Sequence, residues 1–232
     1  MKNIKLFCFP HLGGSASIYY QWKKIIHKNI EIVPIELAGR GERNKEQLYK
    51  DFKELLSDVC IQVTDNNLEN YAFFGHSMGA LIAYETVYNL LNQGFPPPIH
   101  IFFSGSNPPN HKSSLFFKQL NEHDLVSELK KIGGIPDVIF EYPELIEVIL
   151  PIIQADYKVM NTYKFVLQTP KMKNDITIIL GDCDSTIIYE KIAKWRLLTT
   201  GKSSVHFMKG KHFYIDNSLK DLLKLIELKL LK

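Results

Sequence analysis

The sequence predicts an α/β fold with a doubly wound, mainly parallel sheet. Short apolar runs alternate along the chain with longer segments of helical period, as expected when strands and helices take turns. Several of the apolar runs are continuous, which is typical of strands that are covered on both faces. With 232 residues, of which 45% are hydrophobic, the chain is long enough for one such domain with a large core.

Six apolar runs are the candidate strands, and five segments between them have helical patterns. The expected strands cover residues 4–10, 30–37, 71–75, 100–104, 176–181 and 205–208. The expected helices cover residues 17–28, 46–64, 78–93, 189–199 and 218–231.

The stretch from about 113 to 163 interrupts this order, because it contains apolar residues at helical spacing and no strand-like run. We expect two or three helices inserted between two strands. At the C-terminal edge of the sheet they would form a lid over a substrate chamber. Additional core is the alternative interpretation. The expected organisation is a single domain over residues 1–232, with a helical lid insertion at about 113–163.

A Gly-x-Ser-x-Gly pattern, Gly75 to Gly79, follows one expected strand and precedes an expected helix. This strand–turn–helix setting predicts a nucleophile elbow with Ser77 exposed at the C-terminal edge of the sheet. There the helix N-terminus would stabilise a developing oxyanion. Gly75 and Gly79 would avoid Cβ clashes in the tight turn. The alternative is that Ser77 only caps the helix.

Two further segments supply the partners that a serine nucleophile needs. A serine hydroxyl requires a base, and after an elbow of this kind the acid precedes the histidine in the chain. Asp182 and Asp184 follow the expected strand at 176–181, and His212 follows the one at 205–208. We expect His212 to be the base and Asp184 the acid. Asp182 is the alternative acid, although a carboxylate in such a turn often caps its own backbone.

The oxyanion hole should combine two backbone amides. One is expected from Met78, after the nucleophile, and the other from the Gly-rich loop at 9–15. Leu12 is the expected second donor, with His11 as the alternative. We also expect His11 to line the site, whereas His76 should point away from the nucleophile and be packed.

Composition argues against several other classes of protein. The net charge is +3 and the lysines are scattered, so we expect no nucleic-acid partner. The chain contains no HExxH motif and no clustered Cys/His spacing, so no metal is expected. Cys8, Cys60 and Cys183 form no disulfide framework. Without a signal-peptide pattern or an apolar run of ~20 residues, we expect a cytoplasmic protein that does not contact membranes, with a monomer as the default.

The chain as a whole resembles type II thioesterases, the stand-alone editing hydrolases of nonribosomal peptide and polyketide synthases. The family's blocks occur in its order at residues 6–16, 34–43, 75–80, 150–157, 181–184 and 210–213. Three positions depart from the family pattern: Ala38 replaces a Pro, Gln154 a frequent Arg, and Lys211 a usual Gly.

This resemblance implies an α/β-hydrolase fold with Ser77, Asp184 and His212 as the catalytic triad. It implies hydrolysis of acyl thioesters from the phosphopantetheine arm of carrier protein domains, which clears misprimed or stalled acyl groups in antibiotic biosynthesis. The substrate carries the phosphopantetheine, so no further cofactor is expected. A medium-chain fatty acyl thioesterase or a carboxylesterase could use the same triad. A non-catalytic binding module is a further alternative, but such modules usually lose a triad member.

Overall fold

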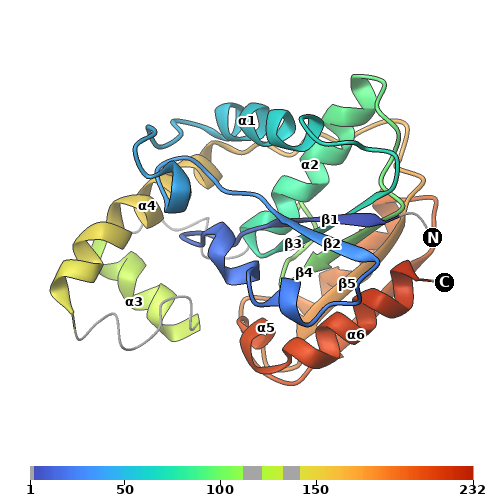
Figure 1. The fold of residues 1–232 in the computed structure, drawn as a ribbon. Helices are drawn as coiled ribbons and strands as arrows, with labels where there is room; N and C mark the ends of the chain where they lie inside the picture. The colour runs from blue at the N-terminus through green and yellow to red at the C-terminus, as the bar shows by residue number, and fades with distance from the viewer. Residues whose placement is uncertain (1–2, 112–121, 133–141, 232) are drawn as a thin grey trace.

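A six-stranded parallel sheet forms the centre of the molecule in the computed structural model, which describes residues 3–111, 122–132 and 142–231 (Figure 1). The strand order is β2-β1-β3-β4-β5-β6, and all neighbouring strands are parallel. The strands are β1 (Ile4–Phe9), β2 (Ile30–Pro34), β3 (Tyr71–His76), β4 (His100–Ser104), β5 (Asp175–Gly181) and β6 (Ser203–Met208). All six expected strands are therefore confirmed, although β2 ends three residues before the predicted end.

Burial along the strands explains why their sequences are continuously apolar. Every residue of the central strands β3 and β4 is buried, because helices cover both faces of the sheet. The edge strand β6 differs, since Val205 and Phe207 are 43% and 58% exposed. One face of this strand is therefore open to solvent.

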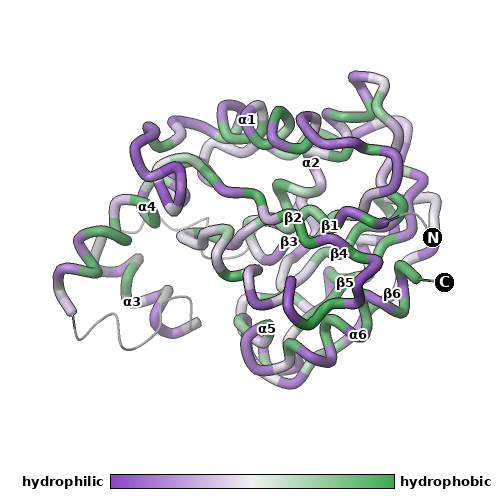
Figure 2. The backbone as a smooth tube through the Cα atoms, viewed as in Figure 1, coloured by the Kyte–Doolittle hydropathy of each residue, from purple (hydrophilic) through white to green (hydrophobic). Residues whose placement is uncertain are grey.

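The sheet separates two apolar clusters. In β1, Phe7 and Phe9 point into one cluster, and Leu6 and Cys8 point into the other, as the two-residue period of a strand requires. Helices α1 (Phe52–Thr64) and α2 (Met78–Asn92) cover the first face. Helices α5 (Tyr214–Asn217) and α6 (Leu219–Leu230) cover the second (Figure 1). Hydrophobic and hydrophilic residues alternate around α1 and α6, as their half-buried positions demand (Figure 2).

Two of the expected helices are 3₁₀-helical. Residues 17–28 contain η1 (Ala16–Tyr19) and η2 (Trp22–Lys24), and residues 189–199 contain η6 (Tyr189–Leu198). The buried side chains recur every three residues, at Ala16 and Tyr19 in η1 and at Ile192, Trp195 and Leu198 in η6. Residues three apart eclipse one another in a 3₁₀ helix, so this geometry places each set on one face.

Helix α1 begins at Phe52, six residues later than the sequence pattern suggested. The Asp51 side chain caps it by accepting the Glu54 N–H (2.8 Å), and Glu54 Oε2 accepts the Lys50 N–H (2.8 Å). The arrangement is similar to a capping box, except that Glu54 reaches the amide before the cap rather than that of Asp51 itself, and it fixes the first turn of the helix.

The predicted lid region contributes two described helices, α3 (Glu122–Ile132) and α4 (Pro143–Thr162), between β4 and β5. Its parts at 113–121 and 133–141 lie outside the described residues. Figure 1 shows α3 and α4 beyond one end of the sheet, with α4 reaching toward α1. The C-terminal half of α4 is anchored there, because Thr162 Oγ1 accepts the Phe52 N–H (2.9 Å) and Val159 and Met160 are buried. Within the described ranges, no helix is long and apolar enough to span a membrane.

Candidate active site

The turn between β3 and α2 has the geometry of a nucleophile elbow. Ser77 has φ 56° and ψ −115°, a conformation that non-glycine residues rarely adopt. A Cβ atom at Gly75 would collide with the backbone of Gly79, and one at Gly79 would collide with the Phe9 carbonyl. Both glycines are therefore required for the close approach of strand, helix and neighbouring loop.

The structure brings Ser77, His212 and Asp184 together, although they lie far apart in the sequence. His212 Nε2 is 2.9 Å from Ser77 Oγ, and His212 Nδ1 is 2.7 Å from Asp184 Oδ2. His212 is only 4% exposed and Asp184 1%, so water competes weakly for these contacts. This chain of hydrogen bonds can draw a proton from Ser77 and stabilise the resulting imidazolium.

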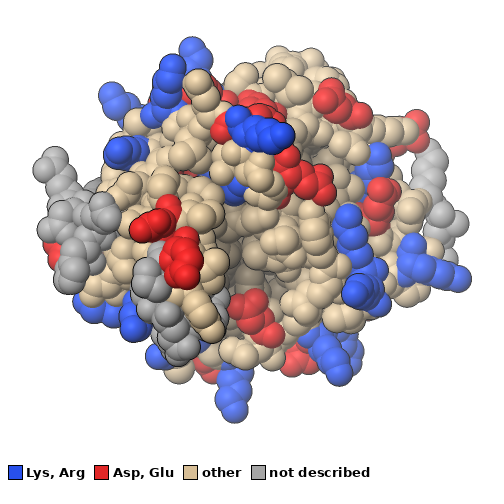
Figure 3. Space-filling model, turned by 60° about the vertical axis from the view of Figure 1, so that its left-hand side comes forward, with Lys and Arg blue, Asp and Glu red and all other residues tan. Residues whose placement is uncertain are grey.

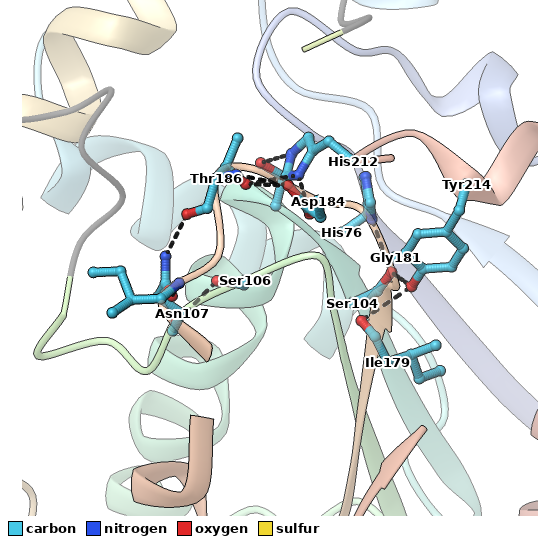
Figure 4. A network of polar contacts seen from close by, with 12 residues as sticks. His76, Ser104, Ser106, Asn107, Ile179, Gly181, Asp184, Thr186, His212 and Tyr214 are labelled. Carbon is cyan, nitrogen blue, oxygen red and sulfur yellow. Dashed lines mark hydrogen bonds and ion pairs between the residues drawn. The ribbon is translucent and has the colours of Figure 1, made fainter. Parts of the chain in front are cut away.

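Thr186 completes the environment of Asp184. Its backbone N–H and its hydroxyl both donate to Asp184 Oδ1, at 2.9 and 2.7 Å (Figure 4). Burial alone would raise the pKa of Asp184, but the hydrogen bonds from His212 and Thr186 outweigh it and hold that pKa below its usual value. Our sequence analysis missed Thr186, although an Asp-x-Thr turn is a local signal for such a contact.

Asp182, the alternative acid, does not face the histidine. Its exposed carboxylate accepts the N–H of Gly210 (2.8 Å), and that hydrogen bond lowers the pKa of Asp182. Cys183, between the two aspartates, has an exposed thiol. Of the two candidate acids, only Asp184 is in contact with His212.

The loop after β1 lies against the elbow, as an oxyanion loop should. Two of its amides already have acceptors inside the protein. The Gly13 N–H donates to Asp156 Oδ2 (2.8 Å), and the Gly14 N–H donates to the His11 carbonyl (2.9 Å). Pro10 has no N–H, so the remaining amides of this part of the loop are those of the two predicted candidates, Leu12 and His11.

Met78 is the first residue of α2, and its N–H is one of the helix-terminal amides that lack an intrahelical acceptor. The close approach of Gly79 to the Phe9 carbonyl places the loop after β1 beside this helix N-terminus. The geometry therefore allows an amide from the loop and the Met78 amide to serve one oxyanion. Either Leu12 or His11 can supply the loop amide of this oxyanion hole.

His76 lies behind the triad and is fully buried. Its Nδ1 is 2.8 Å from Ser104 Oγ, which lies 2.5 Å from the Tyr214 hydroxyl, and that hydroxyl donates to the Ile179 carbonyl at 3.1 Å (Figure 4). The donors and acceptors of this chain match when Nδ1 of His76 carries the proton, and the buried Nε2 then has no hydrogen-bond partner among the described residues. Burial, with the nearby rings of His212 and His11, holds the pKa of His76 well below its usual value. His76 is thus packed and hydrogen-bonded, as expected from the sequence, and its ring is neutral near pH 7.

The side chain of His11, in the loop after β1, packs beside the triad. Its ring is 4.8 Å from that of Phe213, the residue after the catalytic candidate His212, and 6.1 Å from that of His76. Burial lowers the pKa of His11 to about 4, so the ring is neutral near pH 7.

A cavity of about 900 Å³ opens beside the loop after β1. Helix α4 supplies an apolar wall, and the loops after β1 and β2 supply polar groups. Figure 3, which brings the α4 side of the molecule forward, shows a hollow in this surface. The cavity reaches the flank of the site at His11 and Phe213. Its other lining residues are Gly13, Gly14, Ser15, Ser17, Ile18, Gly39, Arg40, Gly41, Asn44, Val148, Ile149, Ile152, Ile153, Ile215 and Asp216.

Among the described residues, no group of three or more His, Cys, Asp or Glu side chains is arranged to hold a metal ion.

A parallel sheet carrying a nucleophile elbow after β3, with helices on both faces, is the architecture of the α/β-hydrolases, and this fold and site define that class. The family model described as "Thioesterase domain" matches residues 4–230, so the chain belongs to the thioesterase family.

Each of the following relatives is matched over more than four fifths of its own length. Gramicidin S biosynthesis protein GrsT of Aneurinibacillus migulanus is 29% identical, over 96% of this chain and 87% of that protein. The medium-chain S-acyl fatty acid synthase thioesterase of Rattus norvegicus is 32% identical, over 91% of this chain and 81% of that protein. Among solved structures, ClbQ from the colibactin NRPS/PKS pathway has a TM-score of 0.91 and 31% identity, covering 98% of this chain and 97% of that one.

Proposed function

We propose that this thioesterase hydrolyses acyl thioesters on the phosphopantetheine arm of carrier proteins, with Ser77, His212 and Asp184 as its triad. The observation that carries the proposal is the hydrogen-bonded chain from Ser77 through His212 to Asp184, located at the elbow of a thioesterase-family fold. The biological role would be to clear misprimed or stalled acyl groups during nonribosomal peptide or polyketide synthesis. Similarity to GrsT and ClbQ, both named for such pathways, supports this role.

The mechanism follows from the geometry of the site. His212 Nε2 accepts the Ser77 proton as Ser77 Oγ attacks the thioester carbonyl carbon. The Met78 amide and an amide of the loop after β1, Leu12 in our proposal, stabilise the tetrahedral oxyanion. His212 then protonates the leaving pantetheine thiolate and afterwards activates the water that hydrolyses the acyl-enzyme. Asp184 holds the His212 tautomer throughout. None of these steps calls for a metal or a cofactor bound to the protein.

The proposed partners are acidic acyl or peptidyl carrier domains, which a chain of net charge +3 would meet with a slight electrostatic advantage. We further propose that the protein is a monomer and that it acts in the cytoplasm, on the carrier domains of such synthases.

Ser77→Ala tests the proposal directly. Release of an acetyl group from a loaded carrier protein should fall by roughly 10⁴-fold or more, because no nucleophile remains. The thermal midpoint should stay close to that of the wild type, and a fluorophosphonate should label the wild type but not the variant. Normal turnover by the variant would contradict the assignment of Ser77.

A second candidate function is release of finished medium-chain fatty acids, since the rat relative of 32% identity is named for that activity. The two functions predict different chain-length preferences. Rates on a carrier loaded with acetyl and with decanoyl groups would separate them, because a releasing enzyme should ignore the short chain and an editing enzyme should accept it.

A further inference from the structure

Two sequence blocks that lie outside the triad meet at a buried ion pair. Arg40 lies in the loop after β2, and Asp156 lies on α4, 116 residues later. Arg40 Nη1 is 2.7 Å from Asp156 Oδ2, and Nη2 is 2.6 Å from Oδ1, which makes the pair bidentate. The two side chains are only 2% and 1% exposed.

The same pair holds the backbone of the loop after β1. Asp156 Oδ2 accepts the Gly13 N–H at 2.8 Å, and Arg40 Nη1 donates to the Gly14 carbonyl at 3.2 Å. Gly13 has φ 75°, and a Cβ atom there would collide with Ile153, which precedes Asp156 on α4. Polar and apolar contacts from α4 therefore determine where Gly13 lies.

Gly13 directly follows Leu12, the proposed loop donor of the oxyanion hole. The Leu12 N–H lies one residue before the Gly13 N–H, which Asp156 holds, so this anchor restricts where the Leu12 backbone can lie. We propose that Arg40 and Asp156 are positioning residues for the oxyanion hole, and that they make its geometry depend on the position of α4. This inference rests on the proposed function only in assigning the loop after β1 to the oxyanion hole.

A purely stabilising role explains the pair less well. Burying two charges costs a desolvation penalty that their attraction often fails to exceed, so apolar residues of similar size can be as stabilising. Leucine at position 156 would, however, leave the Gly13 N–H without its acceptor. The Asp156 carboxylate is thus needed to hold the loop after β1 more than to stabilise the fold.

The test replaces both charges together, because a single replacement would leave an unpaired buried charge and could unfold the protein. The variant is Arg40→Met with Asp156→Leu. Its substrate is p-nitrophenyl acetate, an activated ester that requires the oxyanion hole but no carrier protein. We expect kcat and kcat/KM to fall together by ~100-fold, as when an oxyanion donor is lost. Affinity for phenylboronic acid, which forms a tetrahedral adduct, should fall with them.

A rescue variant and a matched control sharpen the result. Arg40→Met with Asp156→Asn keeps an acceptor for the Gly13 N–H without any charge, and we expect it to recover activity to within ~10-fold of the wild type. Tyr163→Phe removes a different hydrogen bond of the α4 end, the 2.6 Å contact with Glu85 Oε1, and should leave kcat/KM unchanged.

Three outcomes would overturn the proposal. These are a folded Met/Leu variant with wild-type kcat, an equal loss in Met/Asn and Met/Leu, or an equal loss in Tyr163→Phe. The proposed function is judged separately, by hydrolysis of an acyl-carrier thioester by the wild type. A wild type that cleaves the ester and ignores the thioester would reject that function and leave this test intact.

Discussion

Replacing Asp184 with Asn would invert the tautomer of His212. In the native protein, Asp184 Oδ1 accepts two donors from Thr186, and Oδ2 accepts the His212 Nδ1–H. An asparagine must place its carbonyl oxygen where Thr186 donates, so its NH₂ group faces His212 Nδ1. The ring proton then moves to Nε2, which faces Ser77 Oγ and can no longer accept the serine proton.

A tautomer inversion of this kind lowers kcat by about 10⁴, which corresponds to ~5.5 kcal/mol of transition-state stabilisation. The assay is p-nitrophenol release from an activated ester, since Cys183 has an exposed thiol that would react with thiol reagents. Asp182→Asn is the matched control: its exposed carboxylate accepts the Gly210 N–H and interacts with the Cys183 thiol, but it does not contact His212, so activity should stay within about twofold.

The result that would refute this reasoning is an Asp184→Asn variant that is folded and retains more than about a tenth of wild-type kcat. If Asp182→Asn instead lost activity by a similar factor, the acid would be Asp182.

Three further predictions concern stability. Gly79→Ala should cost ~3 kcal/mol or more in urea unfolding, because the new Cβ meets the Phe9 carbonyl; a loss below 1 kcal/mol would mean that the elbow can relax. The pKa values of His11, about 4, and of His76 lie below those of the unfolded chain because both rings are buried, so their stabilisation is complete above about pH 6.5 and is lost as the pH falls; His11 alone should account for ~2 kcal/mol by pH 5, and urea midpoints independent of pH would contradict this. Phe102→Ala, in buried β4, should cost ~3–5 kcal/mol, whereas Phe207→Ala, on the exposed face of β6, should cost under ~1 kcal/mol in the same assay.

The parts of the fold that the sequence predicted are those encoded locally. Each strand is a short run whose burial follows from its own composition, and the elbow is five consecutive residues with two glycines that sterics require. The choice of Asp184 over Asp182 agrees with the observed contact to His212, but both acids precede the same turn and only the fold separates them.

The type of helix was harder to predict than its position. Apolar residues that recur every three residues were interpreted as the 3.6-residue period of an α-helix. Ile192, Trp195 and Leu198 are spaced by three residues, and over so short a segment an α-helix and a 3₁₀ helix place them on similar faces. The contact between Arg40 and Asp156 had no local signal at all. Arg40 and Asp156 each lie in a segment that resembles the thioesterase family. Only the folded chain, however, brings together two side chains that are 116 positions apart.

The connection between β4 and β5 has a consequence for how this enzyme can vary. The two strands are parallel neighbours, with Ile101 paired to Ile176, so the chain must return from one end of the sheet to the other between them. Helices α3 and α4 occupy this return path, where an ordinary crossover would place a single helix. Doubling the length of such a connection costs only ~0.6 kcal/mol of closure entropy. The covering segment can thus be lengthened, shortened or exchanged with little effect on strand pairing, provided that the turn of α4 that touches Gly13 is kept. The cavity wall that α4 supplies and the α4 contact that holds Gly13 can in this sense vary separately.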